Sequence, residues 1–553
     1  LVALGVLRLS HEEYDLAIDA ILEGLRIQKA RRDPRGMARS LHILSEVYVQ
    51  QEHWDWAISC LTDVQHIERR LYGPDHVETA HTLNRLGHVH AQRHEFDEAM
   101  EKHLKALQVL KLSVGEDPNH PFVCQTLIKI GDIYYQERNS LDNIVSSSSN
   151  NSFEFLPMIE VIARAHEARG NYKQALGFFE EKLQLLPQPD APLLLSLGTM
   201  SCKCGQFMEA IDYYQQALEV TNEEAHAAMA NVLVGTVEYH LGNYAQAWTL
   251  LETARKTLEP ECGSNSEVVA DIMYRQGWVQ LSLEQYEGAK TTWLIAFQIQ
   301  VDLFGPQDLA VLQTRLALYE LELMQDSFTE VSYERMVSEI TTIQNQQQET
   351  LGQTSHPLLA DTILLLANVH LSYSFAFPNN VATKAGIRLL RQSFHMRERF
   401  LGRDHPLQAT TFYWLAIAGI RLFQKHKTGI PMLQSVVRVW KETVGEKHTN
   451  VALAYHMLGR CCAALGQMEA AHIWLDHAWK IVNQQNCSRT IAQVLVSRGM
   501  VQLKQCHFQV ARESLQTALS IYERRLSMAS NHYLVKEAKD SLERVERDEM
   551  LCV

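Results

Sequence analysis

The sequence contains little proline and little glycine, and it carries no excess of positive charge. Its 553 residues include 14 Pro and 26 Gly, which favours long helices over a fold built on many tight turns. The formal net charge of −14 argues against a nucleic-acid coat and against a basic membrane-surface protein. Because hydrophobic residues make up 46% and charged residues 21%, the chain can bury a core, which argues against wholesale disorder.

Long apolar runs and a disulfide framework are also missing. No stretch reaches the roughly 18 apolar residues that span a bilayer, and the longest candidates, at residues 363–371 and 414–423, are interrupted by His, Asn or Arg. The ten cysteines do not form a disulfide scaffold, since the closest ones, Cys461–Cys462 and Cys202-x-Cys204, cannot easily bridge within helices. We expect a cytoplasmic protein in a reducing compartment, without membrane insertion.

Catalytic and cofactor-binding motifs are absent as well. The sequence has no GxxxxGK[ST], GxGxxG, GxSxG or HExxH. His90 and His94 have the i, i+4 spacing of metal ligands, but no third ligand accompanies them, and no second CxC or CxxC pair completes a zinc set. We therefore predict that the protein is not an enzyme and has no cofactor and no metal site.

What the sequence does contain is a repeat of three small residues. Gly87 is followed after twelve residues by Ala99 and after seven more by Ala106. The same spacing recurs at Gly198/Ala210/Ala217, Gly235/Ala247/Ala254, Gly277/Ala289/Ala296, Gly459/Ala471/Ala478 and Gly499/Ala511/Ala518. Six complete triplets in one register are very unlikely to arise by chance.

Between the small residues, the apolar positions have helical spacing, as in Phe96, Met100, Leu104 and Leu107. Each unit is thus predicted to be two amphipathic helices, and its small residues let the two backbones approach closely. One such hairpin cannot bury both of its faces, but stacked neighbours can.

This pattern resembles the tetratricopeptide repeat over nearly the whole chain. Thirteen units follow from the first small residue of each, at Gly5, Ser45, Gly87, Gly131, Ala163, Gly198, Gly235, Gly277, Ala317, Ala367, Ala416, Gly459 and Gly499. The resemblance implies an all-α fold, a right-handed superhelical solenoid of about thirteen antiparallel helix pairs, some of them degenerate.

Many linkers between units carry a second signature, as in LYGPDHVETAHTL, LGRDHPLQATTFYWL and VGEKHTNVALAYHML. A glycine ends the long second helix, at Gly73, Gly402 and Gly445, and His-Pro or a similar pair starts the next one. This longer form resembles the repeats of kinesin light chains and their relatives. The resemblance implies a peptide-binding solenoid that attaches cargo or regulators.

The repeat register and its interruptions predict the domain organisation. We expect an N-terminal array at 1–139, a flexible Ser/Asn-rich loop at 140–152 that contains NIVSSSSNNS, a central array at 153–340, a C-terminal kinesin-light-chain-like array at 341–530, and a capping helix with a tail at 531–553.

In the resembling family, the first helix of each unit lines a concave groove. The matching positions here are predicted to be Arg39, His42, His81, Asn84, Arg85, His88, Gln125 and Lys129. Such grooves use Asn, Arg and Lys to hold an extended peptide that has acidic residues around an aromatic. We expect a comparatively polar and cationic groove in this region. Farther along, Tyr274, Arg275 and Trp278, then Tyr413, Ile417 and Ile420, suggest a more apolar groove suited to a helix or to the protein's own tail.

The leading hypothesis is a non-enzymatic scaffold or adaptor that binds peptides or partner subunits, including a motor or cytoskeletal complex, but no nucleic acid. The alternative is a regulatory sensor arm of a larger polypeptide, whose catalytic or nucleotide-binding domain would precede Leu1. A full-length sequence would separate these hypotheses, because upstream heptads favour the adaptor and an upstream P-loop domain favours the sensor.

Overall fold

The structure is a computed structural model that describes residues 2–10, 13–114, 120, 122–123, 125–131, 133, 156–221, 223–325, 329–485, 487–526, 528, 530 and 532–552. Within these ranges the chain is helical and contains no strand. The predicted Ser/Asn-rich loop at 140–152 lies outside them. The helices fall into two compact units, Leu1–Pro187 and Gln188–Val553, and each is described by itself.

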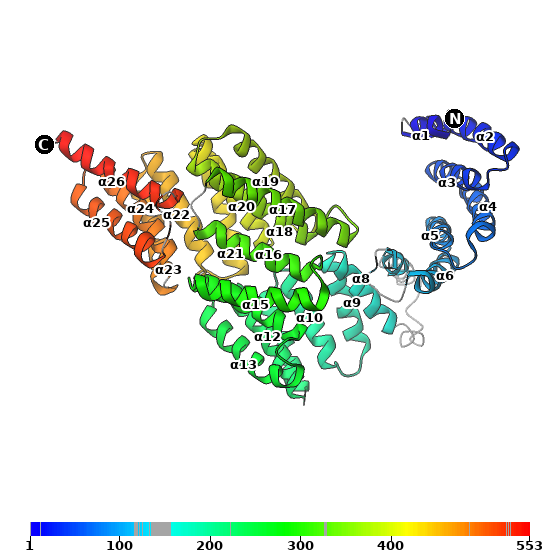
Figure 1. Ribbon diagram of the computed structural model, residues 1–553, viewed down its shortest axis with the longest axis horizontal. Helices are drawn as coiled ribbons and strands as arrows, with labels where there is room; N and C mark the ends of the chain where they lie inside the picture. The colour runs from blue at the N-terminus through cyan, green and yellow to red at the C-terminus, as the bar shows by residue number, and fades with distance from the viewer. Residues whose placement is uncertain are drawn as a thin grey trace. The chain divides into compact units, whose positions relative to one another are not determined.

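The first unit, drawn in blue to cyan in Figure 1, is built from pairs of neighbouring helices. Its helices are α1 (Val2–Ser10), α2 (Tyr14–Ala30), α3 (Pro34–Gln50), α4 (Trp54–Tyr72), α5 (Val77–Gln92), α6 (Phe96–Val114), α8 (Leu156–Ala168) and α9 (Tyr172–Leu185), and residues 125–131 are also helical. Successive helices from α1 to α6 pack on one another, and α8 packs on α9; the packing is most extensive within the pairs α1/α2, α3/α4, α5/α6 and α8/α9.

The second unit continues the same arrangement. Its helices are α10 (Ala191–Lys203), α11 (Phe207–Val220), α12 (Glu224–His240), α13 (Tyr244–Cys262), α14 (Glu267–Ser282), α15 (Tyr286–Phe304), α16 (Leu309–Gln325), α17 (Glu330–Leu351), α18 (Pro357–Ala376), α19 (Asn380–Phe400), α20 (Pro406–Phe423), α21 (His426–Thr443), α22 (Thr449–Ala464), α23 (Met468–Gln485), α24 (Ser488–Lys504), α25 (Phe508–Ser520), a π-helical turn η1 (Ile521–Arg525) and α26 (Tyr533–Cys552). These stacked pairs confirm the predicted all-α solenoid. The domain boundaries inside it stay a prediction.

The small residues let the two helices of each pair approach closely, as the repeat pattern predicts. A Cβ added at Gly459 would lie 3.2 Å from the backbone oxygen of Ala471, and one at Gly499 would lie 3.3 Å from that of Ala511, so the paired backbones nearly touch. Larger side chains from the second helix fill the space beside each glycine, sixteen residues later, as Tyr214 does at Gly198. Nothing larger than hydrogen fits there without moving a core side chain.

The linker histidines cap the helices that follow them. His76, His356, His405, His448 and His532 each stand at or beside a helix start, and each Nδ1 accepts a hydrogen bond from the backbone N–H two residues later at 3.1 or 3.2 Å. Such a bond satisfies one of the backbone donors that the first turn leaves unpaired. The linker signature therefore encodes a helix cap.

α18 is long and apolar enough to cross a membrane by length and composition, a match that the sequence reading did not predict. In this fold 78% of its most apolar window is buried, and it packs on α17 and α19. A core helix of a folded domain passes the same test, and the burial of α18 fits that role.

The second unit closes on itself. The turn after α10 meets the start of α20, where the ring nitrogen Nε2 of His405 lies 3.1 Å from the carbonyl oxygen of Lys203. The turn after α14 likewise meets the start of α24, because the backbone N–H of Arg489 donates to Oε1 of Glu284 at 2.7 Å. A continuous apolar cluster joins Phe207 and Ala210 of α11 to α20–α22. Helices five pairs apart along the chain thus share one core.

Candidate functional site

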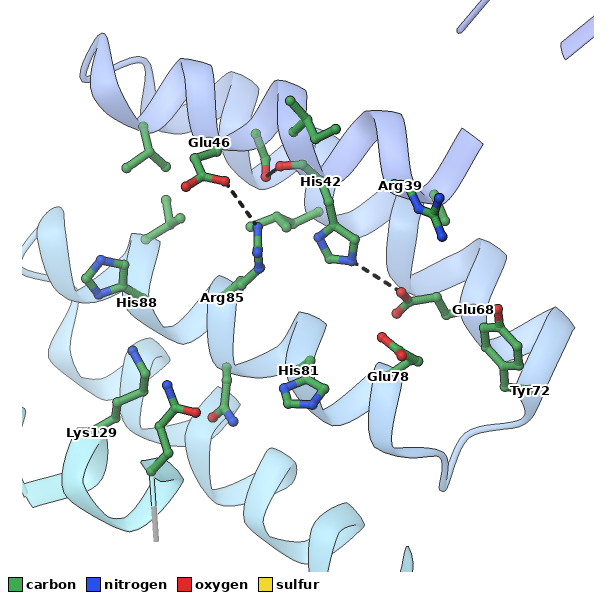
Figure 2. A pocket seen from close by; sticks show the side chains of 18 of the residues that line it. Arg39, His42, Glu46, Glu68, Tyr72, Glu78, His81, Arg85, His88 and Lys129 are labelled. Carbon is green, nitrogen blue, oxygen red and sulfur yellow. Dashed lines mark hydrogen bonds and ion pairs between the residues drawn. The ribbon is translucent and has the colours of Figure 1, made fainter. Parts of the chain in front are cut away.

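All eight predicted groove residues line one cavity in the first unit. Its volume is about 950 Å³, and it is walled by α3, the end of α4, α5 and the helical residues 125–131. Figure 2 shows Arg39 and His42 on one wall, and His81, Arg85 and His88 on the next, with Lys129 beyond them. The structure therefore brings the predicted residues together. That they bind a peptide stays a prediction.

Local sequence fixes the direction of these side chains. The Asp33 carboxylate accepts a hydrogen bond from the Gly36 backbone N–H at 3.0 Å and starts α3, with Pro34 as its first residue. From there Arg39 and His42 are three residues apart on one face, while Leu44 and Val47 are buried in the core. In α5, spacings of four and three residues place His81, Arg85 and His88 toward the cavity.

His42 belongs to a polar cluster in the cavity wall. Its Nε2 lies 3.2 Å from Oε1 of Glu68, and the Thr82 hydroxyl donates to Oε2 of Glu68 at 2.6 Å. Glu68 is only 3% exposed, so these contacts compensate its lost hydration. The other ring nitrogen of His42, Nδ1, is buried and has no hydrogen-bond partner. His42 therefore helps to order the cavity wall through Nε2, and its Nδ1 is left without a hydrogen-bond partner.

Asn84 is tied into the interior as well. Its side-chain oxygen accepts from Nδ1 of His103 at 2.8 Å, and its amide donates to the Thr126 hydroxyl at 2.7 Å. Burial, with help from Lys129 and His88, lowers the pKa of His103 to about 3, so the ring is neutral and Nδ1 carries its proton toward Asn84. Because both ends of the amide are used, Asn84 is the least available of the eight residues for a ligand.

Arg85 is the cation best placed for a partner. The Arg85 side chain is half exposed, and its Nη1 lies 3.9 Å from Oε2 of Glu46. This ion pair is long and solvated, so it contributes little to stability. Arg39 is also exposed, and Arg35 lies over the ring of Tyr72 at 5.8 Å. The guanidinium groups therefore keep donors for an incoming carboxylate.

Neutral histidines and facing acids limit the positive charge of the cavity. Burial is the main reason that the pKa values of His81 and His88 lie below the ordinary value, which leaves both rings neutral at pH 7. The cations that remain are Arg35, Arg39, Arg85 and Lys129, and the facing acids are Glu46, Glu68 and Glu78. Four minus three gives a net charge of +1.

The cavity residues that sequence reasoning missed lie at helix ends, outside the predicted groove positions. Glu68 and Tyr72 stand at the end of α4, and Glu78 stands in the first turn of α5. Rules that count from the first small residue select only the middle of each first helix, so they pass over the ends of neighbouring helices. A glutamate that takes the place of an apolar residue on the core face of a helix, as Glu68 does, is the signal that would have found this cluster.

No group of three or more potential metal-ligating side chains occurs in the part of the chain that the structure describes. Within that part, His90 of the His90/His94 pair contacts Oε2 of Glu95 through Nδ1 at 2.7 Å. The cysteines Cys202, Cys204, Cys461 and Cys462 are free thiols.

Comparisons with known proteins agree with this architecture. Two tetratricopeptide repeat models match the chain, one at residues 36–112 and 420–484 and the other at 159–192 and 193–228. The first match contains Arg39, His42, His81, Asn84, Arg85 and His88. The chain therefore contains tetratricopeptide repeats, whose fold serves protein–protein interaction and is not typically catalytic.

Two curated relatives from Arabidopsis thaliana have low similarity to the chain. Protein KINESIN LIGHT CHAIN-RELATED 1 is 23% identical over 51% of this chain and 50% of its own length, and Protein KINESIN LIGHT CHAIN-RELATED 3 is 23% identical over 34% and 32%. The chain thus spans half or less of these relatives. A chain in a crystal structure of the APC/C hetero-tetramer Cut9-Hcn1 aligns over 98% of this chain and 95% of its own, with 14% identity and a TM-score of 0.49.

Proposed function

We propose that the first unit is the peptide-binding part of a non-enzymatic adaptor, and that its cavity holds an extended segment of a partner protein with acidic residues around an aromatic. One observation carries this proposal. Three successive first helices, α3, α5 and the helix at 125–131, present Arg39, Arg85 and Lys129 to a single cavity of about 950 Å³.

The chemistry of the wall supports an extended peptide. Arg39 and Arg85 offer planar guanidinium groups to carboxylates, and the neutral rings of His81 and His88 offer a surface for an aromatic side chain. Because Glu46, Glu68 and Glu78 share the wall, they repel acidic residues placed out of register. We expect modest affinity and strict dependence on the order of charges in the peptide.

The low similarity to kinesin light chain-related proteins supports a role in attaching cargo to a motor or cytoskeletal complex, as part of the same proposal. The free cysteines of the described residues support a cytoplasmic setting, because such thiols persist where the compartment is reducing.

Fluorescence polarisation of a labelled peptide, with Trp flanked by Asp and Glu, tests the proposal with the full chain. Arg85→Gln should weaken binding about tenfold, since a charge-assisted hydrogen bond is worth about 1.5–3 kcal/mol. Binding should also weaken between 50 and 300 mM salt because the paired charges are partly exposed.

Arg26→Gln is the matched control, because Arg26 is 82% exposed on α2 and does not line the cavity. A scrambled peptide and a Lys/Arg-substituted peptide control for sequence and charge. Equal loss of binding in both variants, or equal binding of all three peptides, would contradict the proposal.

A further inference from the structure

The second unit contains a cavity that the proposed function does not use. Its volume is about 670 Å³, and residues of α10, α12, α14, α16, α18, α20, α24 and α26 line it, with Leu251 of α13, Gln347 of α17 and Arg397 of α19. The predicted groove residues Tyr274, Arg275 and Trp278 face it. Tyr413 and Ile417 do not, since they are buried in the apolar core and are 9% and 4% exposed.

Contacts between distant helices surround this cavity. Besides the contacts of His405 and Arg489, a Cβ placed at Gly242 would lie 2.9 Å from the His448 ring, so the turn after α12 is packed against the start of α22. Three contacts therefore join distant helices of this unit, α10 to α20, α12 to α22 and α14 to α24. A folded partner or a long peptide would have to separate these contacts or thread between them, whereas a small molecule would not.

The lining combines a large apolar surface with buried charge. Trp278 and Trp414 line the cavity together with Leu316, Leu323, Leu364 and Leu365. Among them stand the cations Lys203, Arg275, Arg397 and Arg489, against the acids Asp271, Asp361 and Glu320. Burial, and then Asp361, raises the pKa of Glu320 to about 7, so the cavity carries a net charge between +1 and +2 at neutral pH.

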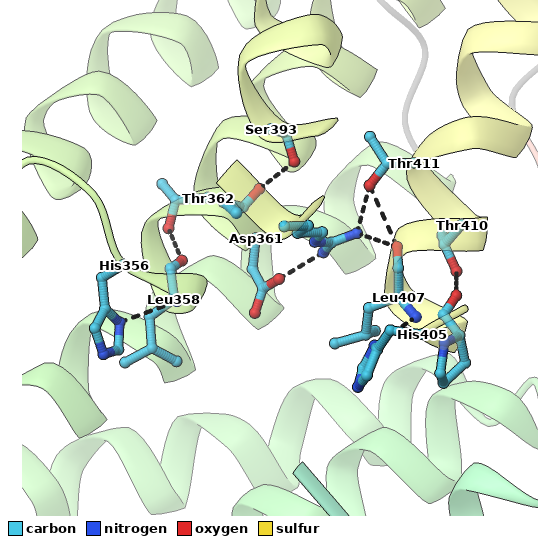
Figure 3. A network of polar contacts seen from close by, with 12 residues as sticks. His356, Leu358, Asp361, Thr362, Ser393, His405, Leu407, Thr410 and Thr411 are labelled. Carbon is cyan, nitrogen blue, oxygen red and sulfur yellow. Dashed lines mark hydrogen bonds and ion pairs between the residues drawn. The ribbon is translucent and has the colours of Figure 1, made fainter. Parts of the chain in front are cut away.

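Arg275 and Arg397 are held in place by the wall. Arg275 donates through Nε to Asp271 at 2.8 Å and through Nη1 to the Thr236 hydroxyl at 2.6 Å, and it remains 27% exposed. A guanidinium has five N–H donors, so further donors remain for a ligand. Arg397 is anchored through its contacts with Asp361, Thr411 and the Leu407 carbonyl, which Figure 3 shows as dashed lines around the labelled residues.

Several lining groups are left with unsatisfied polar atoms. Nε of Arg397, Nε2 of Gln347 and Oδ1 of Asn368 are buried and have no hydrogen-bond partner, and Arg397 and Gln347 are only 2% and 0% exposed. Buried polar atoms without partners are costly, and they are rare in a native protein. All three residues belong to the lining of this one cavity.

We propose that the second unit binds a small amphipathic organic anion in this cavity, with its apolar body against Trp278 and Trp414 and its anionic head at Arg275. The cavity size lies within the range of small-molecule sites, and the excess of cations complements a carboxylate or sulfonate. The site is separate from the peptide cavity, which lies wholly in the first unit.

Binding of 8-anilinonaphthalene-1-sulfonate to the full chain tests this proposal, by fluorescence titration and by native mass spectrometry. We expect saturable binding of one probe per chain, and displacement by dodecanoate. Arg275→Gln should weaken binding about tenfold or more because it removes the charged donors. Asn368→Phe should weaken it by filling the cavity with a ring. Circular dichroism and thermal unfolding show whether each variant is folded.

Arg438→Gln is the matched control, because Arg438 is an exposed arginine of the same unit that pairs with Asp404 and Glu442 outside the cavity. Unchanged binding in this variant and loss in either cavity variant support the site. Non-saturable binding, several probes per chain, equal affinity in all variants, or displacement by peptides but not by dodecanoate would overturn it. If neither cavity variant folds, stoichiometric displacement by dodecanoate from the unaltered chain decides the question.

Discussion

The substitution Gly277→Ala tests the packing rule that the repeat pattern implies. A Cβ at Gly277 would lie 2.2 Å from Nε1 of Trp293, far inside the contact distance. Trp293 is fully buried, and its Nε1 donates to the Tyr274 carbonyl at 2.9 Å. The added methyl group must therefore move a large core side chain and strain or break a buried hydrogen bond.

The expected magnitude follows from three contributions. Overpacking costs about 1–3 kcal/mol, and a buried donor left without its acceptor costs about 1–3 kcal/mol. The better helix propensity of alanine returns about 1 kcal/mol. We expect a net loss of about 1–5 kcal/mol in the free energy of unfolding.

Gly419→Ala is the matched control, because a Cβ at this helical glycine of α20 meets no atom within 4 Å. It should stabilise the chain by about 0.5–1 kcal/mol, through propensity alone. Urea denaturation followed by circular dichroism measures the overall effect, and hydrogen exchange of α14 and α15 peptides locates it, since a repeat array need not unfold in one step. If Gly277→Ala were as stable as the unaltered chain, the close approach of the two helices would be refuted.

Two further predictions concern buried charge. Glu537 of α26 pairs with Arg421 and Arg460, and although burial alone would raise the pKa of Glu537, these arginines hold it well below its usual range. Glu537→Gln should therefore lower the free energy of unfolding by about 3 kcal/mol and raise the rate of hydrogen exchange in α26. Glu543→Gln, on the exposed face of α26, should do neither. Equal exchange rates in the two variants would contradict this prediction. The free energy of unfolding should also fall as the pH drops below about 6.5, because histidines that stay neutral in the folded chain become protonated in the unfolded chain. Each such histidine should lower it by about 1.4 kcal/mol per pH unit. In the folded state, burial is the main cause that lowers the pKa values of His103, His456 and His532 to about 3. A urea midpoint at pH 5.5 equal to that at pH 7.5 would refute the second prediction.

The fold could be predicted because its determinants are local and periodic. The register of Gly198, Ala210 and Ala217 fixes where two helices meet, and the structure buries both alanines and leaves no room for a side chain at the glycine. The same register selects the faces of α3, α5 and the helix at 125–131, which is why all eight candidate residues line one cavity. A pattern that sets the direction of side chains on a helix is visible in the sequence itself.

What could not be predicted depends on contacts between distant parts of the chain. The hydrogen bonds of Asn84 to His103 and Thr126 turn a presumed ligand-binding amide into an internal connector. The acids Glu68 and Glu78 enter the cavity from helix ends that the groove rule does not count, and they reduce its positive charge. The register of small residues gives the positions that meet, but it does not specify which polar side chains will pair there.

The closure of the second unit is the most consequential of these long-range effects. A groove lined by successive first helices can accept a peptide only while its two edges stay apart. In the second unit the turn after α10 and the start of α20 share a hydrogen bond and an apolar core, so opening the edges would expose buried surface and break the contact of His405 with the Lys203 carbonyl. The same repeat pattern therefore leads to a different kind of site. Apolar side chains and cations such as Arg275 line a cavity that suits a small ligand better than a peptide.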